Sequence, residues 1–493
     1  MPSIVSRRIA AMLLATVAVA PATAAPLDAQ QTAQILKLAQ AQAPAMDKAA
    51  LAIWNFAEVG YQEQRSSALL QAQLKSSGFT VTPGVAGMPT AFVASYRNGD
   101  GPVIAILAEF DALPGLAQTA DPVRTPIAGQ RAGHGCGHNL FGAASAAAAI
   151  AVRNWMVAQG VKGEIRVYGT PAEEGGSGKV YLVRDGLFKD VDVTLHWHPG
   201  STNDASQTSS LANISGKFRF HGVAAHAAAA PDRGRSALDG VQVMTTAVEF
   251  LREHVPDGTR IHYVITNGGK APNVVPDFAE LYLYVRHGDP QVVKDVWARV
   301  LKAAEGAAIA TGTTTDHEIT GGVYSLLPNE TLMKAMDESL HAVPITPWSD
   351  GEQAFATKIA QGFAGKPAVL DATVIETATF RGTGGLSQGS TDVSDVSWTV
   401  PTVGLSTMTY VPGTPGHSWQ ATAAAGSPVG LKGARTAAET LALTAGRLLV
   451  DRDLVAAAKQ EFQKARGDDF VYKAMVGDRK PPLDYRKDSA GSE

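Results

Sequence analysis

Three short strand-like runs constrain the fold of this chain more than any other feature. They cover residues 103–107, 164–168 and 191–198, and each is followed closely by a glycine, a proline or an acidic residue. Runs of this length are typical of strands in a largely parallel sheet. An alanine-rich stretch at residues 139–157 predicts a helix that packs closely on that sheet. The sequence therefore predicts an α/β fold with a mostly parallel sheet.

The pattern changes near residue 209. From there to about residue 325, strand-like and helix-like stretches follow the order β-α-β-β-α-β, which is typical of a compact α+β domain. The whole chain, at 493 residues, is too long for a single hydrophobic core. We therefore predict a lid or dimerisation domain at 209–325, inserted into a catalytic domain built from residues 26–208 and 326–493. Residues 477–493 are polar and contain proline, which predicts an extended or loose tail.

The first 24 residues predict a cleaved signal peptide. Arg7 and Arg8 precede a short apolar run at residues 9–20, and small residues at 22–24 offer a cleavage site. The apolar run is too short to cross a bilayer as a mature helix. We expect the mature protein to be periplasmic or secreted. The two arginines leave both the general secretory route and the twin-arginine route open.

Charge and cysteine content narrow the classes of partner. The net charge of −4 gives no reason to expect nucleic acid or an anionic membrane. Cys136 is the only cysteine in the sequence, so no intramolecular disulfide can form. A lone thiol in an exported protein has to be buried or bound to a metal.

Polar side chains gather just after the strand-like runs, where ligands bind in open α/β sheets. Cys136 and His138 begin the alanine-rich helix, and thiolate and imidazole are both good metal ligands. Glu173 and Glu174 follow the second run, where one carboxylate could bind a metal while the other holds a proton. Each pair alone also has a structural interpretation, as a buried thiol beside a capping histidine and as a solvated loop.

Three histidines complete the candidate set. His196 and His198 lie two apart on a strand and therefore share a face. His417 ends a loop of glycine and proline at residues 413–417. A single histidine is more often structural than a metal ligand, but their joint occurrence at segment ends indicates a metal centre.

Eight stretches carry a resemblance to a known family, in the family's order and over most of the chain. They are residues 108–115, 133–142, 169–178, 197–199, 221–239, 271–277, 390–398 and 413–420. These motifs resemble the aminoacylase and carboxypeptidase-G type of co-catalytic metallohydrolase. Within it, they are similar to the auxin-conjugate and hippurate hydrolase branch and to the group of p-aminobenzoyl-glutamate hydrolase B subunits.

The resemblance implies a ligand set for two divalent metals, manganese or zinc. Cys136 would bridge the two ions, while His138, Glu174, His198 and His417 would complete the sites. In the family pattern the strand histidine that binds metal lies six residues after an aspartate, here Asp192. That spacing selects His198 and leaves His196 with a supporting or structural role.

The resemblance also implies roles beyond the ligands. Glu173 would be the general base that deprotonates the bridging water, and Asp111 would orient a histidine ligand. His226 would reach a neighbouring subunit's active site and stabilise the oxyanion. Asn273 and Arg286 would bind the substrate's carboxylate.

The function implied is hydrolysis of an amide bond in an N-acyl amino acid or a dipeptide-like substrate with a free carboxylate, p-aminobenzoyl-glutamate among them. A homodimer through the lid is expected, with an A-subunit-like partner as the alternative. The predicted export is at odds with the intracellular enzymes of the B-subunit group, and it leaves both the substrate and the partner open.

Two other functions compete with this interpretation. Residues 385–389 match the G-x-S-x-G nucleophile elbow, which would make Ser387 the nucleophile of a serine hydrolase. The elbow needs a strand before it and a helix after it, whereas glycines crowd the residues in front. An exported, non-catalytic binding subunit is the second alternative. The presence of Glu173 argues against it, because a binding protein has little need of a base.

Overall fold

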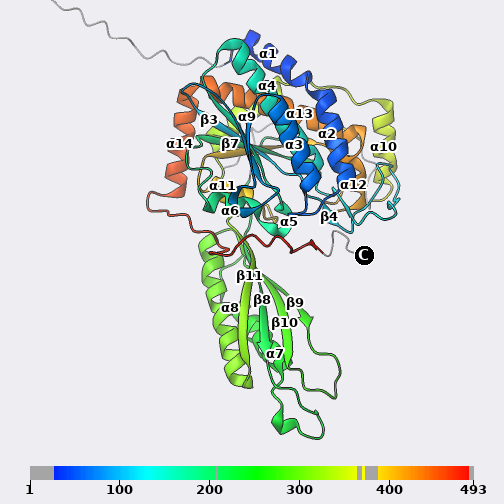
Figure 1. Cartoon of the computed structure of the whole chain (residues 1–493), viewed down its shortest axis with the longest axis vertical. Helices are drawn as coiled ribbons and strands as arrows, with labels where there is room; N and C mark the ends of the chain where they lie inside the picture. Colours follow the sequence, from blue (N-terminus) through cyan, green and yellow to red (C-terminus); the bar gives the residue numbers. More distant parts are fainter. Residues whose placement is uncertain (1–26, 207, 364–368, 372–386, 488–493) are drawn as a thin grey trace, which may run out of the picture.

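The computed structural model describes residues 27–206, 208–363, 369–371 and 387–487. The signal peptide expected at residues 1–24 lies outside these residues. Two main sheets organise the described chain, one of six strands and one of four, and each has its own hydrophobic core. Figure 1 shows the four-stranded sheet and its two helices projecting from the rest of the molecule. We call this projecting part the lid and the remainder the large unit.

The sheet of the large unit confirms the predicted α/β class. Its order is β1 (Thr80–Pro83), β2 (Phe92–Asn98), β6 (Gly163–Gly169), β3 (Val103–Ala108), β7 (Val193–Gly200) and β12 (Thr402–Met408). The last four strands are parallel, whereas β1 and β2 pair antiparallel at one edge. The three predicted runs are the central strands β3, β6 and β7. Their carboxyl ends therefore meet at one edge of the sheet.

Helices cover both faces of this sheet (Figure 1). They are α1 (Ala29–Gln40), α2 (Ala43–Phe56), α3 (Gln64–Ser76), α4 (His138–Gln159), α5 (Glu173–Gly176), α6 (Gly178–Arg184), α9 (Glu330–Ala342), α10 (Asp350–Ala360), α11 (Val393–Ser397), α12 (Trp419–Ala425), α13 (Pro428–Val450) and α14 (Arg452–Arg466). A small ribbon of β4 (Leu113–Pro114) and β5 (Ala132–Gly133) lies beside them. By length and composition α4 could cross a membrane, but 83% of its most apolar window is buried, as in the core helix of a globular protein.

The lid is an antiparallel sheet with two helices on one face. The strand order is β11 (Thr314–Val323), β8 (Ala212–His221), β10 (Phe278–His287) and β9 (Arg260–Asn267), and the helices are α7 (Ala237–Leu251) and α8 (Pro290–Thr311). Because β8 leaves the large unit and β10 returns to it, the loops after β8 and β9 lie at the far end of the lid (Figure 1).

The end of the chain makes contacts with the rest of the protein, and these include residues 477–487, the described part of the tail expected to be extended or loose. The rings of Trp398 and Phe470 lie 4.7 Å apart. The Arg479 guanidinium donates hydrogen bonds to the carbonyl oxygens of Ile319 and Thr320 in β11. These contacts bury aromatic and guanidinium groups that a polar-tail interpretation overlooks. Residues 477–487, called the C-terminal strap below, run between the large unit and the lid (Figure 1).

Candidate metal centre

Cys136 and His138 are placed by a tight turn at the start of α4. Gly137 between them has φ +72°, and a Cβ there would lie 2.6 Å from the Tyr410 hydroxyl and 2.8 Å from Pro199. Only glycine fits this conformation without strain. The turn therefore holds the thiol and the imidazole against the ends of neighbouring strands.

The His138 ring is fixed from both sides. Its Nδ1 lies 2.8 Å from Oδ1 of Asp111, as expected for a carboxylate that orients a ligand, and its Nε2 lies 3.0 Å from Oε2 of Glu109. His138 and both carboxylates are buried. An Nδ1–H that donates to Asp111 leaves Nε2 with a lone pair directed toward Glu109.

The structure brings His198, and not His196, to the cysteine. His198 Nδ1 lies 2.8 Å from the Pro199 carbonyl oxygen, which can only accept, so Nδ1 carries the proton. Nε2 is then free as a ligand atom and lies 3.4 Å from Cys136 Sγ. The His196 ring packs against Gly404 of β12, where a Cβ would collide with it. Burial lowers the pKa of His196 to about 3, in keeping with a neutral ring inside the protein.

Glu174 and His417 approach each other from two irregular segments. Gly175, within the short α5, has φ +93°, and His417 itself has φ +54°. Glu174 is buried, whereas the His417 side chain is 57% exposed. Their Oε1 and Nε2 atoms lie 3.3 Å apart. The backbone N–H of Glu174 donates to Asp111, which ties this segment to the carboxylate that holds His138.

The five predicted ligands form two groups that share one sulfur atom. Cys136, His138 and His198 form one group, and Cys136, Glu174 and His417 form the other; within each group the ligand atoms lie within 4.8 Å of one another. Buried atoms in these groups, His138 Nε2 and Glu174 Oε1, have no well-formed hydrogen bond to a described residue. Orphaned polar atoms of this kind are costly unless a ligand satisfies them. Soft sulfur, imidazole and carboxylate donors suit zinc or manganese-range ions, so the residues fit a metal centre.

Glu173 lies at the inner side of these groups. It forms a third set with Glu109 and His138, again with ligand atoms within 4.8 Å of one another. Burial raises the pKa of Glu173 well above its usual range, and repulsion from Glu109 and Glu174 adds to this. A carboxylate with a raised pKa is a stronger proton acceptor than an ordinary glutamate.

Three residues of this site, Lys179, Glu109 and Asp392, were missed by sequence reasoning. The Lys179 side chain is fully buried, and its Nζ lies 2.7 Å from both Glu109 and Asp392. Burial alone would lower the pKa of Lys179, but Asp392 and Glu109 raise it above the usual value. Glu109 thus joins the lysine on one side to His138 on the other. Glu109 lies in a stretch that matched the family, and this was the available signal; nothing in the sequence pairs Lys179 with it.

The remaining predicted residues lie in the lid. His226 and Asn273 are exposed and lie in adjacent loops at its far end, where the Ala227 N–H donates to the Asn273 carbonyl oxygen. Arg286 is near the opposite end of β10, with its guanidinium 5.4 Å from the Tyr284 ring. The structure therefore separates Asn273 from Arg286 by most of the length of a strand. It brings neither His226 nor Asn273 to the metal centre of the same chain.

Ser387 does not lie in a nucleophile elbow within the described residues. Its side chain is exposed, its hydroxyl accepts from the Gly389 N–H at 3.3 Å, and no helix follows until α11. The residues directly before it, 372–386, lie outside the described part of the chain. No described histidine hydrogen-bonds the Ser387 hydroxyl, so the triad geometry that a serine hydrolase needs is not found there.

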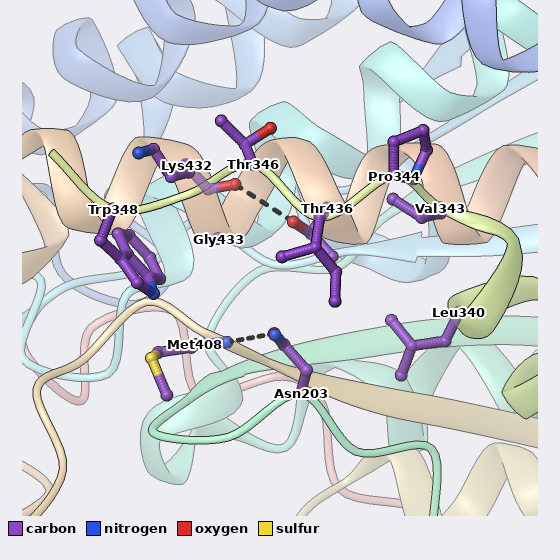
Figure 2. Close-up of a pocket in the computed structure, with 11 residues that line it drawn as sticks. Asn203, Leu340, Val343, Pro344, Thr346, Trp348, Met408, Lys432, Gly433 and Thr436 are labelled. Atoms are coloured by element: carbon purple, nitrogen blue, oxygen red, sulfur yellow. Dashed lines mark hydrogen bonds between the residues drawn. The ribbon is translucent and has the colours of Figure 1, made fainter. Parts of the chain in front are cut away.

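A crevice elsewhere in the large unit is not the active site. Figure 2 shows it between Trp348, Lys432 and Thr436, with Met408 and Asn203 on the opposite side. Its volume of about 20 Å³ holds at most one water molecule. None of the residues that line it belongs to the ligand groups.

Comparisons with known proteins agree with this geometry. A peptidase dimerisation domain matches residues 210–311. The chain is 42% identical over 436 residues to the B subunit of the p-aminobenzoyl-glutamate hydrolase of Escherichia coli K12, covering 84% of this chain and 90% of the relative. It is 31% identical to the Xaa-Arg dipeptidase of Mus musculus, covering 84% and 87%. The solved structure of a dinuclear metal-binding M20 peptidase from Bacillus subtilis has the same fold, with a TM-score of 0.57 at 17% identity, covering 84% and 99%.

Fold and site together define a metal-dependent hydrolase of amide or peptide bonds, in which an α/β unit carries an inserted dimerisation-type domain. The chain belongs to the M20 peptidase family.

Proposed function

We propose that this protein is an exported two-metal amidohydrolase that cleaves N-acyl amino acids or dipeptide-like amides with a free carboxylate. The observation that carries the proposal is the position of Cys136, whose sulfur belongs to two ligand groups at once. A shared donor of this kind suits a pair of ions better than two separate ones. The N-terminal pattern at residues 7–24 supports a periplasmic or secreted location.

The residues that would hold the metals are Cys136, His138, Glu174, His198 and His417. Two divalent ions, manganese or zinc, would supply Lewis acidity toward the substrate carbonyl and lower the pKa of the attacking water. Asp111 holds the His138 ring in the orientation in which Nε2 faces the site.

Glu173 moves the protons in this proposal. Its carboxylate lies within 4.8 Å of the His138 ligand atom but belongs to neither of the two groups that share Cys136, and its raised pKa favours proton uptake. It would take the proton of the attacking water and then pass it to the leaving amine.

The lid completes the site in a homodimer, with an A-subunit-like partner as the alternative. His226 is exposed at the far end of the lid and faces no group of its own metal centre, so a neighbouring subunit is the place where it can act. Strand β9 is an edge of the lid sheet in the described chain, and its Val264 and Ile265 are 58% and 45% exposed. Phe250, at the end of α7, is 68% exposed. An edge strand flanked by apolar side chains is suited to pairing with a second copy.

The substrate class rests on the relatives. One is named for p-aminobenzoyl-glutamate and another for dipeptides that end in arginine. Both kinds of molecule place a free carboxylate next to the amide bond that is cut. We therefore propose p-aminobenzoyl-glutamate as the first substrate to test.

The test starts from protein stripped with a chelator and reloaded with manganese or zinc. Hydrolysis of p-aminobenzoyl-glutamate, hippurate, N-acetyl amino acids and dipeptides is then measured, together with bound metal. We expect no activity without metal, about two ions per chain after reloading, and turnover of at least one substrate. Ser387→Ala should leave activity unchanged. Chelator-resistant activity that Ser387→Ala abolishes would support the serine hydrolase instead, and metal binding without turnover would support a non-catalytic binding protein.

A further inference from the structure

The C-terminal strap lies against the segment that carries Glu174. The Tyr485 hydroxyl donates to the carbonyl oxygen of Glu174 at 3.0 Å, and the rings of Tyr485 and Tyr61 lie 5.7 Å apart. The Gln62 side chain also donates to the Leu483 carbonyl oxygen, at 2.8 Å. The strap is thereby fixed to the segment that carries a proposed metal ligand.

Arg486 follows Tyr485 and lies beside the same segment. A Cβ built on Gly175 would lie 3.8 Å from Arg486 Nη2. Arg486 Nη1 is shielded from solvent and has no hydrogen-bond partner among the described residues. The acidic residue of the strap nearest to Arg486 in the sequence, Asp484, pairs with Lys487 instead, at 3.5 Å. This buried guanidinium nitrogen lacks a hydrogen-bond partner and lies next to the proposed catalytic centre. An anionic ligand bound there would accept its hydrogen bond.

A second guanidinium faces the same region from the lid. Arg286 lies in β10 opposite Asn213 of β8, at the end of the lid nearest the large unit, and its guanidinium lies 5.4 Å from the Tyr284 ring. The strap that carries Arg486 runs between the large unit and this end of the lid (Figure 1). Arg286 is the residue that the family resemblance implies for the substrate's carboxylate.

We propose that Arg486 of the C-terminal strap selects substrates with an acidic amino-acid half, by binding the side-chain carboxylate while Arg286 binds the main-chain one. One guanidinium on the strap and one at the adjoining end of the lid match a substrate with two carboxylates. The planar fork of arginine can hold a carboxylate through two parallel hydrogen bonds. This inference rests on the proposed function and adds the residue that decides specificity.

The test compares p-aminobenzoyl-glutamate with p-aminobenzoyl-glutamine, which differ only in the side-chain carboxylate. For Arg486→Gln we expect KM for the glutamate substrate to rise about 10- to 100-fold, with kcat nearly unchanged. The KM for the glutamine substrate should change less than about twofold, so the preference for the acidic substrate disappears. Arg486→Lys should keep part of the preference, because it retains the charge and loses the fork. Lys487→Gln removes a neighbouring exposed charge and should leave both substrates unaffected.

An equal rise of KM for both substrates would overturn the proposal and leave the strap with a structural role only. An unchanged preference in Arg486→Gln would overturn it as well. Calorimetric binding of glutamate and glutamine to the metal-loaded protein gives a readout that does not need turnover, and wild-type protein should prefer glutamate. If wild-type protein binds glutamate selectively and hydrolyses no amide, the proposed function fails while the role of Arg486 stands. If it hydrolyses amides with no preference for acidic ones, the proposed function stands and the role of Arg486 fails.

Discussion

The large unit and the lid place their charged residues in opposite surroundings. In the large unit, Lys179, Glu109 and Asp392 form a chain of ion pairs that is fully buried beneath the metal centre. In the lid, Arg219 pairs with Glu280 and other acids on the uncovered face of the sheet, where these side chains are partly or largely exposed. The first arrangement holds its groups in one geometry, because any displacement leaves a charge buried without a partner. The second costs little to break or rearrange.

This difference separates chemistry from recognition. The proposed ligands and base are pre-positioned in a rigid interior, where each group is oriented by another. His226 and Arg286 lie on a projecting domain, where motion or a second subunit can bring them to the substrate. Closure of such domains over a substrate is common in hydrolases of this design.

The largest effect we expect is on catalysis, and it tests whether the large unit of one subunit works together with the lid of the other. Glu173→Gln in the large unit should lower kcat about 10²- to 10⁴-fold, and His226→Ala in the lid about 10²- to 10³-fold, both with metal retained. Heterodimers of the two variants, purified with two different tags, should recover about half of the wild-type activity. One of their two sites then combines an intact base with an intact lid histidine.

Glu253→Gln, an exposed change in the lid, is the matched control and should keep full activity in every combination. Heterodimers that stay inactive would show that His226 serves its own subunit, and full activity of His226→Ala alone would show that His226 has no role in the reaction. Either result would remove the reason for assigning it to the neighbouring site.

The next effect is on stability and compares the two kinds of ion pair directly. Lys179→Met should lower the free energy of unfolding by about 3 to 5 kcal/mol, because it leaves two buried carboxylates without a cation. Arg219→Met in the lid should cost less than about 1 kcal/mol. Denaturation of the metal-loaded variants in urea measures both. Adding Asp392→Asn to Lys179→Met should recover part of the loss, and equal costs in the two units would contradict the comparison.

The smallest effect is a pH dependence with opposite sign in the two units. Burial raises the pKa of Glu439 on α13 to about 7, so the folded large unit binds a proton that the unfolded chain releases near pH 4.3. Its stability contribution is therefore lost as pH rises between these values. The free energy of unfolding of Glu439→Gln, relative to that of wild type, should therefore increase by about 1 to 2 kcal/mol from pH 5 to pH 8. In the lid, the hydrogen bond from His221 lowers the pKa of Asp316, so its contribution is lost as pH falls.

Urea midpoints measured at pH 5 and pH 8 test the sign for Glu439→Gln, and midpoints measured at pH 3 and pH 6 test it for Asp316→Asn, because an aspartate with a lowered pKa titrates below the ordinary aspartate range. Asp316→Asn should reduce stability by less than about 1 kcal/mol because the pair is exposed, and it should do so more at pH 6 than at pH 3. A common sign for Glu439→Gln and Asp316→Asn would show that burial does not govern these two carboxylates.

Sequence reasoning found residues that sit at the ends of regular elements. Cys136, Glu174 and His198 each follow or begin a strand or helix whose pattern is clear. Sequence reasoning could also have concluded that Asn273 and Arg286 lie far apart in the lid. The strand between them is ten residues long, and a strand of that length spans about 33 Å.

The rest depends on contacts between distant segments. Lys179 and Asp392 are 213 residues apart in the sequence, with the lid inserted between them, and the fold brings their side chains into contact. The polar, proline-containing end of the chain predicts a loose tail, yet Arg479 and Tyr485 find partners in β11 and beside Glu174. Composition cannot predict such contacts, because each needs a partner that only folding brings near.

The sequence by itself determined the α/β class and the inserted α+β domain, because these depend on local periodicity. The five ligand candidates came from residue types at segment ends together with the family resemblance. The tertiary structure decided which atoms face one another. It showed that Cys136 is shared by two ligand groups, that a buried lysine lies behind Glu109, and that Arg486 lies beside Gly175. These facts depend on how the ends of β3, β6, β7 and the last residues of the chain converge, and no single segment carries that information.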